Sequence, residues 1–280
     1  MKKIIALVLL AAMALTLLAS CGSSKKYIVL DDNFGAEEYA IGFRKDDYAL
    51  AAKVQEILDE MGKDGTAGKI AEKWFGNKDA FLTGKDFPRE MKTVDGDDSL
   101  QYILDKGELV LGLDDSFPPM GFSDSKTGEI VGFDIDLAEE VCKRLGVKLV
   151  KQPIDWNSKE MELSSKNIDV IWNGMSVTDE RTENFFLSKP YIANAQIIIV
   201  AEDSPIKTKA DLKGKKVGLQ KGSSALEAVT ADEATLALIN DGGEIVEFAE
   251  NLTAYLDLKA GRIDAFVVDK VVGEYIIKNN

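Results

Sequence analysis

The segment best suited to recognise a ligand is residues 169–191. A short apolar run, residues 170–172, predicts a strand, and three small or polar residues follow it: Asn173, Gly174 and Ser176. Small residues let backbone N–H groups face a cleft, where these groups can bind an anion. The chemistry that this segment suggests is therefore recognition of a negatively charged group.

A single arginine, Arg181, completes this pattern. Thr178 or Asp179 can cap a helix that begins here, and the N-terminus of a helix favours an anion. A guanidinium one turn later can hold a carboxylate through two parallel hydrogen bonds. We therefore predict that Arg181 binds a carboxylate. The alternative is that it pairs with Asp179, Glu180 or Glu183 on a solvated surface.

A second turn of small residues lies at residues 221–224, between a predicted strand and a predicted helix. Ser223 and Ser224 make it a second candidate anion-binding turn, with a plain turn as the alternative. Asp269 directly follows the predicted strand at residues 265–268, where it can accept an ammonium group. Asp269 could also cap the helix that follows, and the two roles are compatible.

Residues 1–20 have the composition of a secretory signal peptide. Two lysines precede an apolar run, residues 4–18, that is too short for a membrane-spanning helix. Cys21 follows Leu-Ala-Ser, an order that resembles a bacterial lipobox and implies cleavage before Cys21 and lipid on its sulfur. An ordinary cleavage site with a chance cysteine is the alternative. We expect residues 21–24 to be a lipid-anchored linker at the extracellular face of the bacterial cell membrane or in the periplasm.

The composition excludes several classes of function. The 280 residues carry a net charge of −14, which would repel nucleic acid and anionic lipid, so contact with a membrane is expected only through lipid at Cys21. The chain has no histidine, which removes Ser-His-Asp and Cys-His catalysis and histidine metal sites. With Cys21 modified, Cys142 has no disulfide partner, and its place in a predicted helix indicates a buried, inert thiol. We expect a monomer with no metal and no cofactor.

Apolar strands alternate with amphipathic helices along the chain, which argues for an α/β fold with mostly parallel sheets. The expected strands are residues 108–113, 148–152, 170–172, 195–201, 217–220 and 265–268. The expected helices are residues 48–61, 133–145, 160–165, 253–260 and 271–277.

Several of these segments together resemble the bacterial extracellular solute-binding proteins of family 3, the receptors of ATP-driven uptake systems for polar amino acids. The segments are residues 132–137, 173–181, 188–191, 211–218 and 260–265, together with Asp269. The resemblance implies a two-lobed, periplasmic-binding-protein-like (type II) fold with two hinge crossings and a ligand between the lobes. It also implies a receptor that delivers a free polar or cationic amino acid to an ABC permease.

The order of the segments departs from that of the family. Residues 38–76 resemble the family's last segment, yet they come first here. The chain ends in a helix, residues 274–280, that would ordinarily run into a segment like residues 26–30. Read as a ring, the order is the usual one, so we expect a circular permutant whose old ends are joined by the polar residues 77–106. A truncated tandem repeat is the alternative.

On this mapping the chain divides into two lobes and two hinge crossings. The expected parts are residues 40–188 for lobe 1, residues 25–34 and 195–280 for lobe 2, and residues 35–39 and 189–194 for the crossings. The permuted order predicts that residues 27–30 form a strand of lobe 2. It also predicts that the helix at residues 48–61 packs on the lobe that holds residues 132–145.

The resemblance also implies roles at the ligand. N–H groups of Ser176 and Ser224 assist Arg181 at the carboxylate, and Asp269 receives the ammonium together with the backbone of Asn173 or Gly174. Phe117 and Trp156 match positions where the family holds an aromatic ring against the ligand's carbon chain, although aromatic residues are more often core. Asp114 and Gln220 match positions that face the far end of the ligand. The further candidates are Asp115, Glu160 and Trp172.

The carboxylate of Asp114 suits an ammonium, a guanidinium or an amide, and it disfavours aspartate or glutamate as the ligand. An enzyme is a competing function, since similar folds host dehydratases and lytic glycosidases. Such reactions need well-placed carboxylic acids. Glu160 is the one candidate in the cleft, with no second carboxylate placed to pair with it, so we expect no enzyme. A sensor or reporter that closes on ligand without transport is the other alternative.

Overall fold

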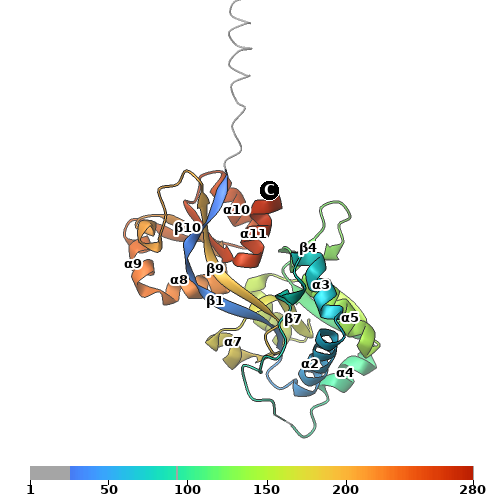
Figure 1. Ribbon diagram of the computed structural model, residues 1–280. Coiled ribbons are helices and arrows are strands. Elements are labelled where there is room, and N and C mark those ends of the chain that lie inside the picture. Colours follow the sequence, from blue (N-terminus) through green and yellow to red (C-terminus); the bar gives the residue numbers. More distant parts are fainter. Residues whose placement is uncertain (1–25, 93, 280) are drawn as a thin grey trace, which may run out of the picture.

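The computed structural model describes residues 26–92 and 94–279. The predicted signal peptide, the predicted linker at residues 21–24 and Cys21 lie outside the described residues. The chain forms two α/β lobes joined by two long strands, β1 (Tyr27–Phe43) and β9 (Ile192–Ala201), which cross the middle of Figure 1. This is the two-lobed arrangement that the sequence predicts.

Lobe 1 is the lower body in Figure 1. Its strands are β2 (Glu108–Leu113), β3 (Ser116–Phe117), β4 (Gly121–Ser123), β5 (Ile130–Val131), β6 (Lys148–Pro153), β7 (Val170–Ser176) and β8 (Phe186–Leu187). Its α-helices are α2 (Tyr48–Lys63), α3 (Thr66–Phe75), α4 (Ser99–Lys106), α5 (Phe133–Leu145), α6 (Lys159–Ser164) and α7 (Asp179–Asn184). Two 3-10 turns, η1 (Lys78–Ala80) and η2 (Trp156–Ser158), complete it.

Lobe 2 is the upper body in Figure 1 and contains the later part of the chain. Its strands are β10 (Lys216–Gln220), β11 (Glu244–Phe248) and β12 (Ala265–Asp269). Its helices are α8 (Ser224–Ala231), α9 (Glu233–Asn240), α10 (Asn251–Lys259) and α11 (Lys270–Asn279), with a 3-10 turn η3 (Lys209–Leu212).

One mixed sheet runs through both lobes, in the order β11-β10-β12-β9-β1-β7-β2-β6. The first half of β1 pairs with β9 in lobe 2, beginning at Tyr27 opposite Ala201. Its second half pairs with β7 in lobe 1, where Tyr39 lies opposite Ser176. The predicted strand at residues 27–30 therefore pairs with a strand of the second lobe, as expected.

The residues expected to form one hinge crossing, 35–39, lie in the middle of strand β1. The β1–β9 register shifts between Val29 and Ala36, and Gly35 there has a φ of 109°. An irregularity of this kind bends a strand without ending it, because the pairing resumes on the far side. β1 can therefore pair with β9 in lobe 2 and with β7 in lobe 1 within one sheet.

The helices follow the apolar periodicity of the sequence. On α2 the buried residues recur every three or four positions, from Tyr48 to Met61, so one face of the helix packs on the lobe. Helix α5 ends at Gly146, whose φ of 76° is the left-handed conformation common at helix C-termini. Helix α2 contacts α5, as the sequence predicts. Cys142 is buried on α5, and burial raises the pKa of its thiol to about 12, which fits an inert core residue.

The sequence analysis missed several elements. Strands β3, β4 and β5 are only two or three residues long, too short for a periodic signal. In β11 and α9 few residues are fully buried, so the apolar pattern is weak. Strand β7 continues to Ser176, where we expected a turn after Trp172, because residues 175–176 still pair with β1. Within the joining residues 77–106 a helix, α4, also forms.

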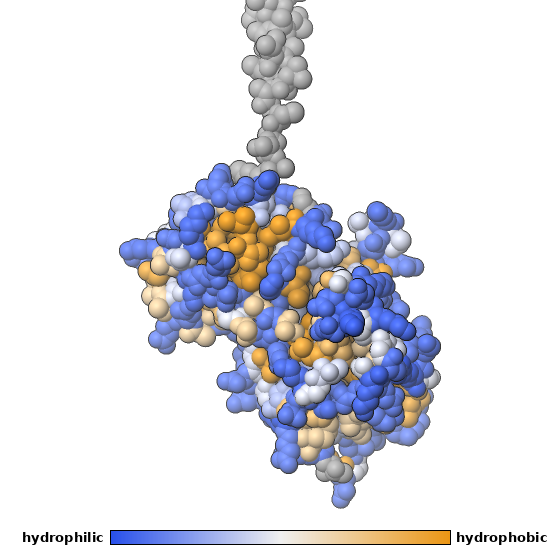
Figure 2. All heavy atoms as spheres, in the orientation of Figure 1, coloured by the Kyte–Doolittle hydropathy of each residue, from blue (hydrophilic) through white to orange (hydrophobic). Residues whose placement is uncertain are grey.

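Charged and polar residues cover most of the face in Figure 2, and apolar side chains gather over α10 and α11. Two of the exposed large apolar residues, Leu252 and Leu256, lie on α10. Across residues 26–92 and 94–279, the structure contains no helix with the length and apolar character needed to cross a bilayer.

The sheet of lobe 1 provides a test of how far its core determines stability. Leu111 on β2 is fully buried, whereas Leu104 on α4 is 40% exposed. We expect Leu111→Ala to lower the free energy of unfolding by about 2–5 kcal/mol, since it removes buried methyl groups and leaves a cavity. Leu104→Ala should change it by no more than about 0.5 kcal/mol. Urea unfolding of both variants checks this, and equal costs would contradict the assignment of the core.

Candidate ligand site between the lobes

The residues predicted at the ligand meet at one small cavity between the lobes. Ten of the eleven line its wall: Asp114, Phe117, Trp156, Asn173, Gly174, Arg181, Gln220, Ser223, Ser224 and Asp269. Ser176 is not part of the wall, and its hydroxyl lies 2.8 Å from that of Ser224 across the lobe interface. The free volume is only about 10 Å³, roughly the space of one water molecule. The two lobes are therefore in contact over the site.

Arg181 is almost completely buried, at 3% exposure. Its backbone N–H donates to the hydroxyl of Thr178, so Thr178 caps α7 as predicted. Its Nη1 donates to the carbonyl of Ser176 at 3.0 Å, and Nη2 lies 3.4 Å from Oε1 of Glu227 on lobe 2. Within the part of the chain that the structure describes, Nε and Nη2 have no hydrogen-bond acceptor. The alternative of a solvated pair with Asp179 or its neighbours is wrong.

Asp114 and Gln220 meet from opposite lobes. Asp114 follows β2, and its Oδ1 accepts hydrogen bonds from the N–H and the hydroxyl of Ser116 at 2.9 and 2.7 Å. Its Oδ2 accepts from Nε2 of Gln220 at 2.6 Å, and Asn251 orients the Gln220 amide by donating to its oxygen. Burial raises the pKa of the Asp114 carboxyl above its ordinary value. Asp114 is therefore a buried acid on the cavity wall, and among the residues that the structure describes its two oxygens accept hydrogen bonds from neutral groups only.

Asp269 occupies another part of the wall. Its Oδ1 accepts three hydrogen bonds, from the hydroxyl of Tyr39 at 2.6 Å, Nδ2 of Asn194 at 2.8 Å and Nε2 of Gln196 at 3.0 Å. Burial, with the nearby Glu37 carboxylate second, raises the pKa of Asp269 well above its ordinary value. Sequence reasoning missed these four partners, although positions 37 and 39, and 194 and 196, share one face of a strand by simple alternation.

Gly174 forms the tightest part of the wall. Its φ is +59°, and a Cβ there would lie 2.7 Å from Cε1 of Phe117 and 2.9 Å from Cε2 of Tyr39. Its N–H donates to Oδ2 of Asp134 at 2.7 Å. Asp134 is fully buried, and burial raises the pKa of its carboxyl to about 7. Asp134 thus fixes the backbone of Gly174 by accepting its N–H, a role that the sequence did not predict.

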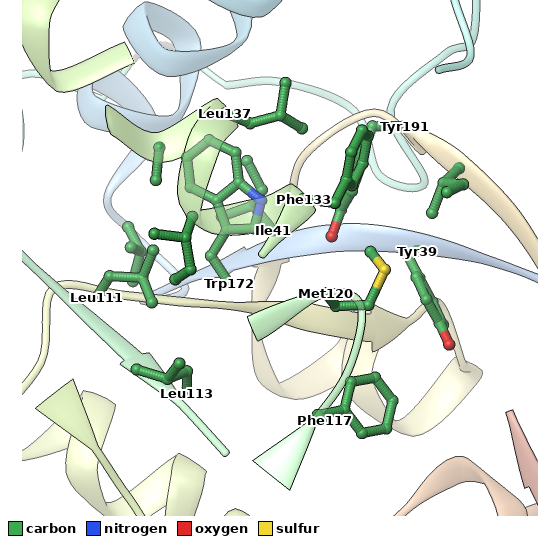
Figure 3. Close-up of a cluster of buried hydrophobic side chains, with 14 of the residues drawn as sticks. Tyr39, Ile41, Leu111, Leu113, Phe117, Met120, Phe133, Leu137, Trp172 and Tyr191 are labelled. Atoms are coloured by element: carbon green, nitrogen blue, oxygen red, sulfur yellow. The ribbon is translucent and has the colours of Figure 1, made fainter. Parts of the chain in front are cut away.

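The aromatic residues divide between the wall and the core beneath it. Phe117 and Tyr39 lie at one end of the apolar cluster in Figure 3, and Trp172 lies within the cluster. Trp172 is fully buried and does not line the cavity, so it is core. Asp115 and Glu160, two further candidates, also do not line the cavity. They bond instead to Ser123 and Asn184 on exposed surface.

A larger groove of about 1030 Å³ lies beside the cavity and shares Arg181 and Ser223 with it. Lys159 of lobe 1 lines this groove and donates through Nζ to the carbonyl of Gly222 on lobe 2 at 3.0 Å. Burial, and secondarily the charge of Arg181, lower the pKa of Lys159 to about 8. Polar contacts from Lys159 and from Arg181 thus link lobe 1 to lobe 2.

Two α/β lobes, two crossing strands and a charged cavity between the lobes define the class of two-lobed ligand-binding proteins. The family model of the bacterial extracellular solute-binding proteins, family 3, matches residues 6–77 and 109–254. The chain belongs to this family. The fold is therefore the periplasmic-binding-protein-like α/β fold that the sequence predicts.

Three relatives illustrate the similarity. The chain is 33% identical over 181 residues to the L-cystine-binding protein TcyJ of Escherichia coli, covering 64% of this chain and 65% of that protein. It is 38% identical over 163 residues to the lysine/arginine/ornithine-binding periplasmic protein of E. coli, covering 58% and 60%. A substrate-binding protein of an ABC uptake transporter from Streptococcus pneumoniae, solved with bound histidine, matches with a TM-score of 0.61 and 38% identity over 66% and 74% of the chains. The match spans less than two thirds of the length of the two E. coli relatives.

The raised pKa of Asp134 predicts how stability depends on pH. The folded protein binds this proton up to about pH 7, and the unfolded chain loses it near pH 4. The stabilisation is therefore complete below about pH 4 and is lost as the pH rises towards 7. Relative to Asp134→Asn, which cannot titrate, the wild type should lose about 4 kcal/mol of unfolding free energy between pH 4 and 8.

Urea unfolding at several pH values checks this prediction. The amide introduced by Asp134→Asn retains an oxygen that can accept the bond from Gly174, so the variant is expected to fold. The exposed Asp95 provides a matched control, and Asp95→Asn should follow the wild-type profile. Parallel profiles for wild type and Asp134→Asn would show that Asp134 is already ionised in the folded protein.

Proposed function

We propose that the protein is a lipid-anchored receptor that binds one free polar or cationic amino acid between its lobes and delivers it to an ABC permease. The observation that carries the proposal is the buried guanidinium of Arg181, whose Nε and Nη2 lack acceptors among the described residues beside a cavity that also presents Asp269 and Asp114. A free amino acid carries a carboxylate and an ammonium, and each needs a partner when it leaves water. The cavity offers a cation, Arg181, for the carboxylate and an acid, Asp269, for the ammonium, and a second acid, Asp114, remains.

In this proposal Arg181 binds the α-carboxylate, assisted by N–H groups at Ser176 and Ser224. Asp269 receives the α-ammonium, together with the backbone of Asn173 or Gly174. The rings of Phe117 and Trp156, both buried and both on the wall, support the ligand's carbon chain. The positions of these groups around one cavity support the assignment.

The charges that remain favour a cationic or amide side chain. Once Arg181 and Asp269 have met the backbone groups of the ligand, Asp114 and Gln220 face its far end. No lysine or arginine of the described residues forms an ion pair with Asp114, and its closest polar partner from the other lobe is the neutral amide of Gln220. A ligand cation would supply the missing counter-charge. One relative above is named for lysine, arginine and ornithine, and the Streptococcus pneumoniae protein was solved with bound histidine, which is consistent with this class. The relative named for cystine binds another polar amino acid.

Entry of a ligand requires the lobes to separate, because the cavity has room for little more than one water molecule. We propose that β1 and β9 bend at the crossings, residues 35–39 and 189–194, between a lobe at residues 40–188 and a lobe at residues 25–34 and 195–280. The circularly permuted order is part of this proposal. It is supported by the pairing of residues 27–30 with β9 and by the contact of α11 with β1 at the other end of the chain.

The remaining parts of the proposal concern location and assembly. Residues 1–20 act as the signal peptide, and lipid at Cys21 anchors a monomer at the extracellular face of the bacterial cell membrane or in the periplasm. The permuted order attaches this anchor to the second lobe. The proposed function involves no reaction. Glu160, the acid considered for catalysis, lines the larger groove and not the small cavity, and it bonds to Asn184 there.

The function is tested by a thermal-shift screen of the twenty amino acids. A ligand at a hundred times its Kd adds about 2.7 kcal/mol of stability, which raises the melting temperature by about 5–10 °C in a protein of this size. We expect arginine, lysine, histidine or an amide to give such a shift. No rise in melting temperature with any of the twenty amino acids would overturn the proposal.

Arg181→Ala should abolish binding of the amino acid found in that screen. Loss of one partner of a buried charge pair costs about 3–5 kcal/mol, a loss of affinity of about a hundredfold or more. Arg262 is the matched control, because its exposed guanidinium pairs with Asp257 away from the cavity. Calorimetry should show wild-type affinity for Arg262→Ala. A loss below tenfold for Arg181→Ala would remove Arg181 from the site.

Asp114→Asn tests the selectivity of the far end. The variant keeps the shape of the side chain but removes its charge, so affinity for a cationic ligand should fall by about 10–100-fold, the value of a charge-assisted hydrogen bond. Affinity for glutamine should change less. Asp115→Asn, at the neighbouring residue that bonds to Ser123, should leave both affinities unchanged. If glutamate or aspartate is the tightest ligand of the wild type, the role of Asp114 is wrong.

A further inference from the structure

A second carboxylate, Glu37, lies close to Asp269, and the proposed function gives it no role. Glu37 lies on β1 directly opposite Asn194 on β9, so both crossing strands contribute to its surroundings. Its Oε1 accepts hydrogen bonds from Nδ2 of Asn194 at 2.5 Å, Nε2 of Gln196 at 2.8 Å and the hydroxyl of Ser176 at 2.8 Å. The acid is therefore held in place by three donors.

The same two amide nitrogens also bind Asp269. Nδ2 of Asn194 lies 2.8 Å from Oδ1 of Asp269, and Nε2 of Gln196 lies 3.0 Å from it. Two carboxyl groups that share the same donors must lie close together, and like charges at that separation disfavour double ionisation. Sharing one proton removes the repulsion, because the pair then carries a single negative charge.

No cation of the described residues neutralises the pair. Neither Glu37 nor Asp269 forms an ion pair with a lysine or arginine in residues 26–92 or 94–279. Arg181 donates to the carbonyl of Ser176, and the hydroxyl of Ser176 donates to Glu37, so Ser176 lies between the two charges. Lys270, the residue after Asp269, pairs with Glu274. The other titratable groups nearby are Tyr39, which donates to Asp269, and Tyr191 beside Tyr39.

We propose that Glu37 and Asp269 form one acid pair that holds a proton and releases it to solvent when the ammonium group of the ligand binds at Asp269. This inference rests on the proposed function and deepens it. The proton leaves as one positive charge and the ammonium arrives as one positive charge, so the net charge of the pair and its cation stays at −1. Burial, and then the Glu37 carboxylate, raise the pKa of Asp269, the direction that favours a bound proton.

Hydrogen bonds also connect the acid pair to both lobes. Glu37 contacts Ser176 of β7, and Gln196 contacts Ser224 of α8, while both acids are bound through the crossing strands. The protonation state of the pair is therefore linked to hydrogen bonds in both lobes and at the hinge. Ligand binding at Asp269 and closure of the lobes act on the same set of bonds.

The experiment is calorimetric titration of the amino acid that binds, at pH 7, in two buffers with different ionisation enthalpies. The difference between the buffers gives the number of protons released per ligand. We expect the wild type to release about half to one proton, and its affinity to rise with pH by up to about tenfold per unit. Glu37→Gln, which keeps the shape and an accepting oxygen, should release close to none.

Glu38→Gln is the matched control, because Glu38 lies on the same strand but pairs with Lys85 at the surface. It should release as many protons as the wild type. Binding without proton release, or equal release by wild type and Glu37→Gln, would overturn the acid pair and leave the proposed function standing. Absence of binding by all twenty amino acids would overturn the proposed function, and the exchange with it.

A measurement without ligand tests whether the pair holds the proton. The folded protein then binds more protons than the unfolded chain above about pH 4, so the stability of the wild type falls as the pH rises. Removing the Glu37 charge lowers the pKa of Asp269 towards its ordinary value, so Glu37→Gln should lose less stability between pH 4 and 8 than wild type or Glu38→Gln. Identical profiles for the three proteins would overturn the proposal.

Discussion

The pairing of β1 with β9 is the interaction on which both the fold and the site depend. Both strands lie at the boundary between the lobes, so the backbone hydrogen bonds that complete the sheet also connect the two lobes. The pairing places Glu37 opposite Asn194 and Tyr39 opposite Ile192. Because side chains alternate along a strand, these polar groups share one face with Gln196. A hinge made of strands thus carries part of the binding chemistry.

Three further site residues come from places where strands end. Asp114 follows β2, Gln220 ends β10 and Asp269 ends β12. The carboxyl ends of strands are where ligands bind in α/β sheets, since the loops there are free to differ without disturbing the sheet. Asp269 could be recognised from a reading of the sequence in this way, because a polar residue just after an apolar run is a clear signal. Asp114 and Gln220 are assigned through the resemblance to the family.

The residues that this reading missed lack such a signal. Glu37, Asn194 and Gln196 lie within strands, where a polar residue every second position usually marks a solvated face. Only the approach of the second lobe buries that face, and no local pattern reports it. Asp134 is similar, because its place in the first turn of α5 suggests a solvated acid, whereas its carboxyl reaches the N–H of Gly174. Long-range pairing, as in the bend of β1 near Gly35, is likewise absent from the local sequence.

The charges of the site explain why closure and recognition cannot be separated. Arg181 and Asp269 are each almost fully buried, and a buried charge is costly unless it is paired. In the closed arrangement some of that pairing comes from the protein: Glu227 approaches Arg181, and Gln220 approaches Asp114. These contacts reach across the lobe interface, so opening the lobes breaks them and exposes the charged groups to water. A ligand that carries a carboxylate and an ammonium can replace these protein contacts and hold the two lobes together. A molecule of the same size without charged groups would leave the buried charges unpaired. Selection for a zwitterion therefore follows from the burial of opposite charges on one wall, and it requires no contact specific to one side chain.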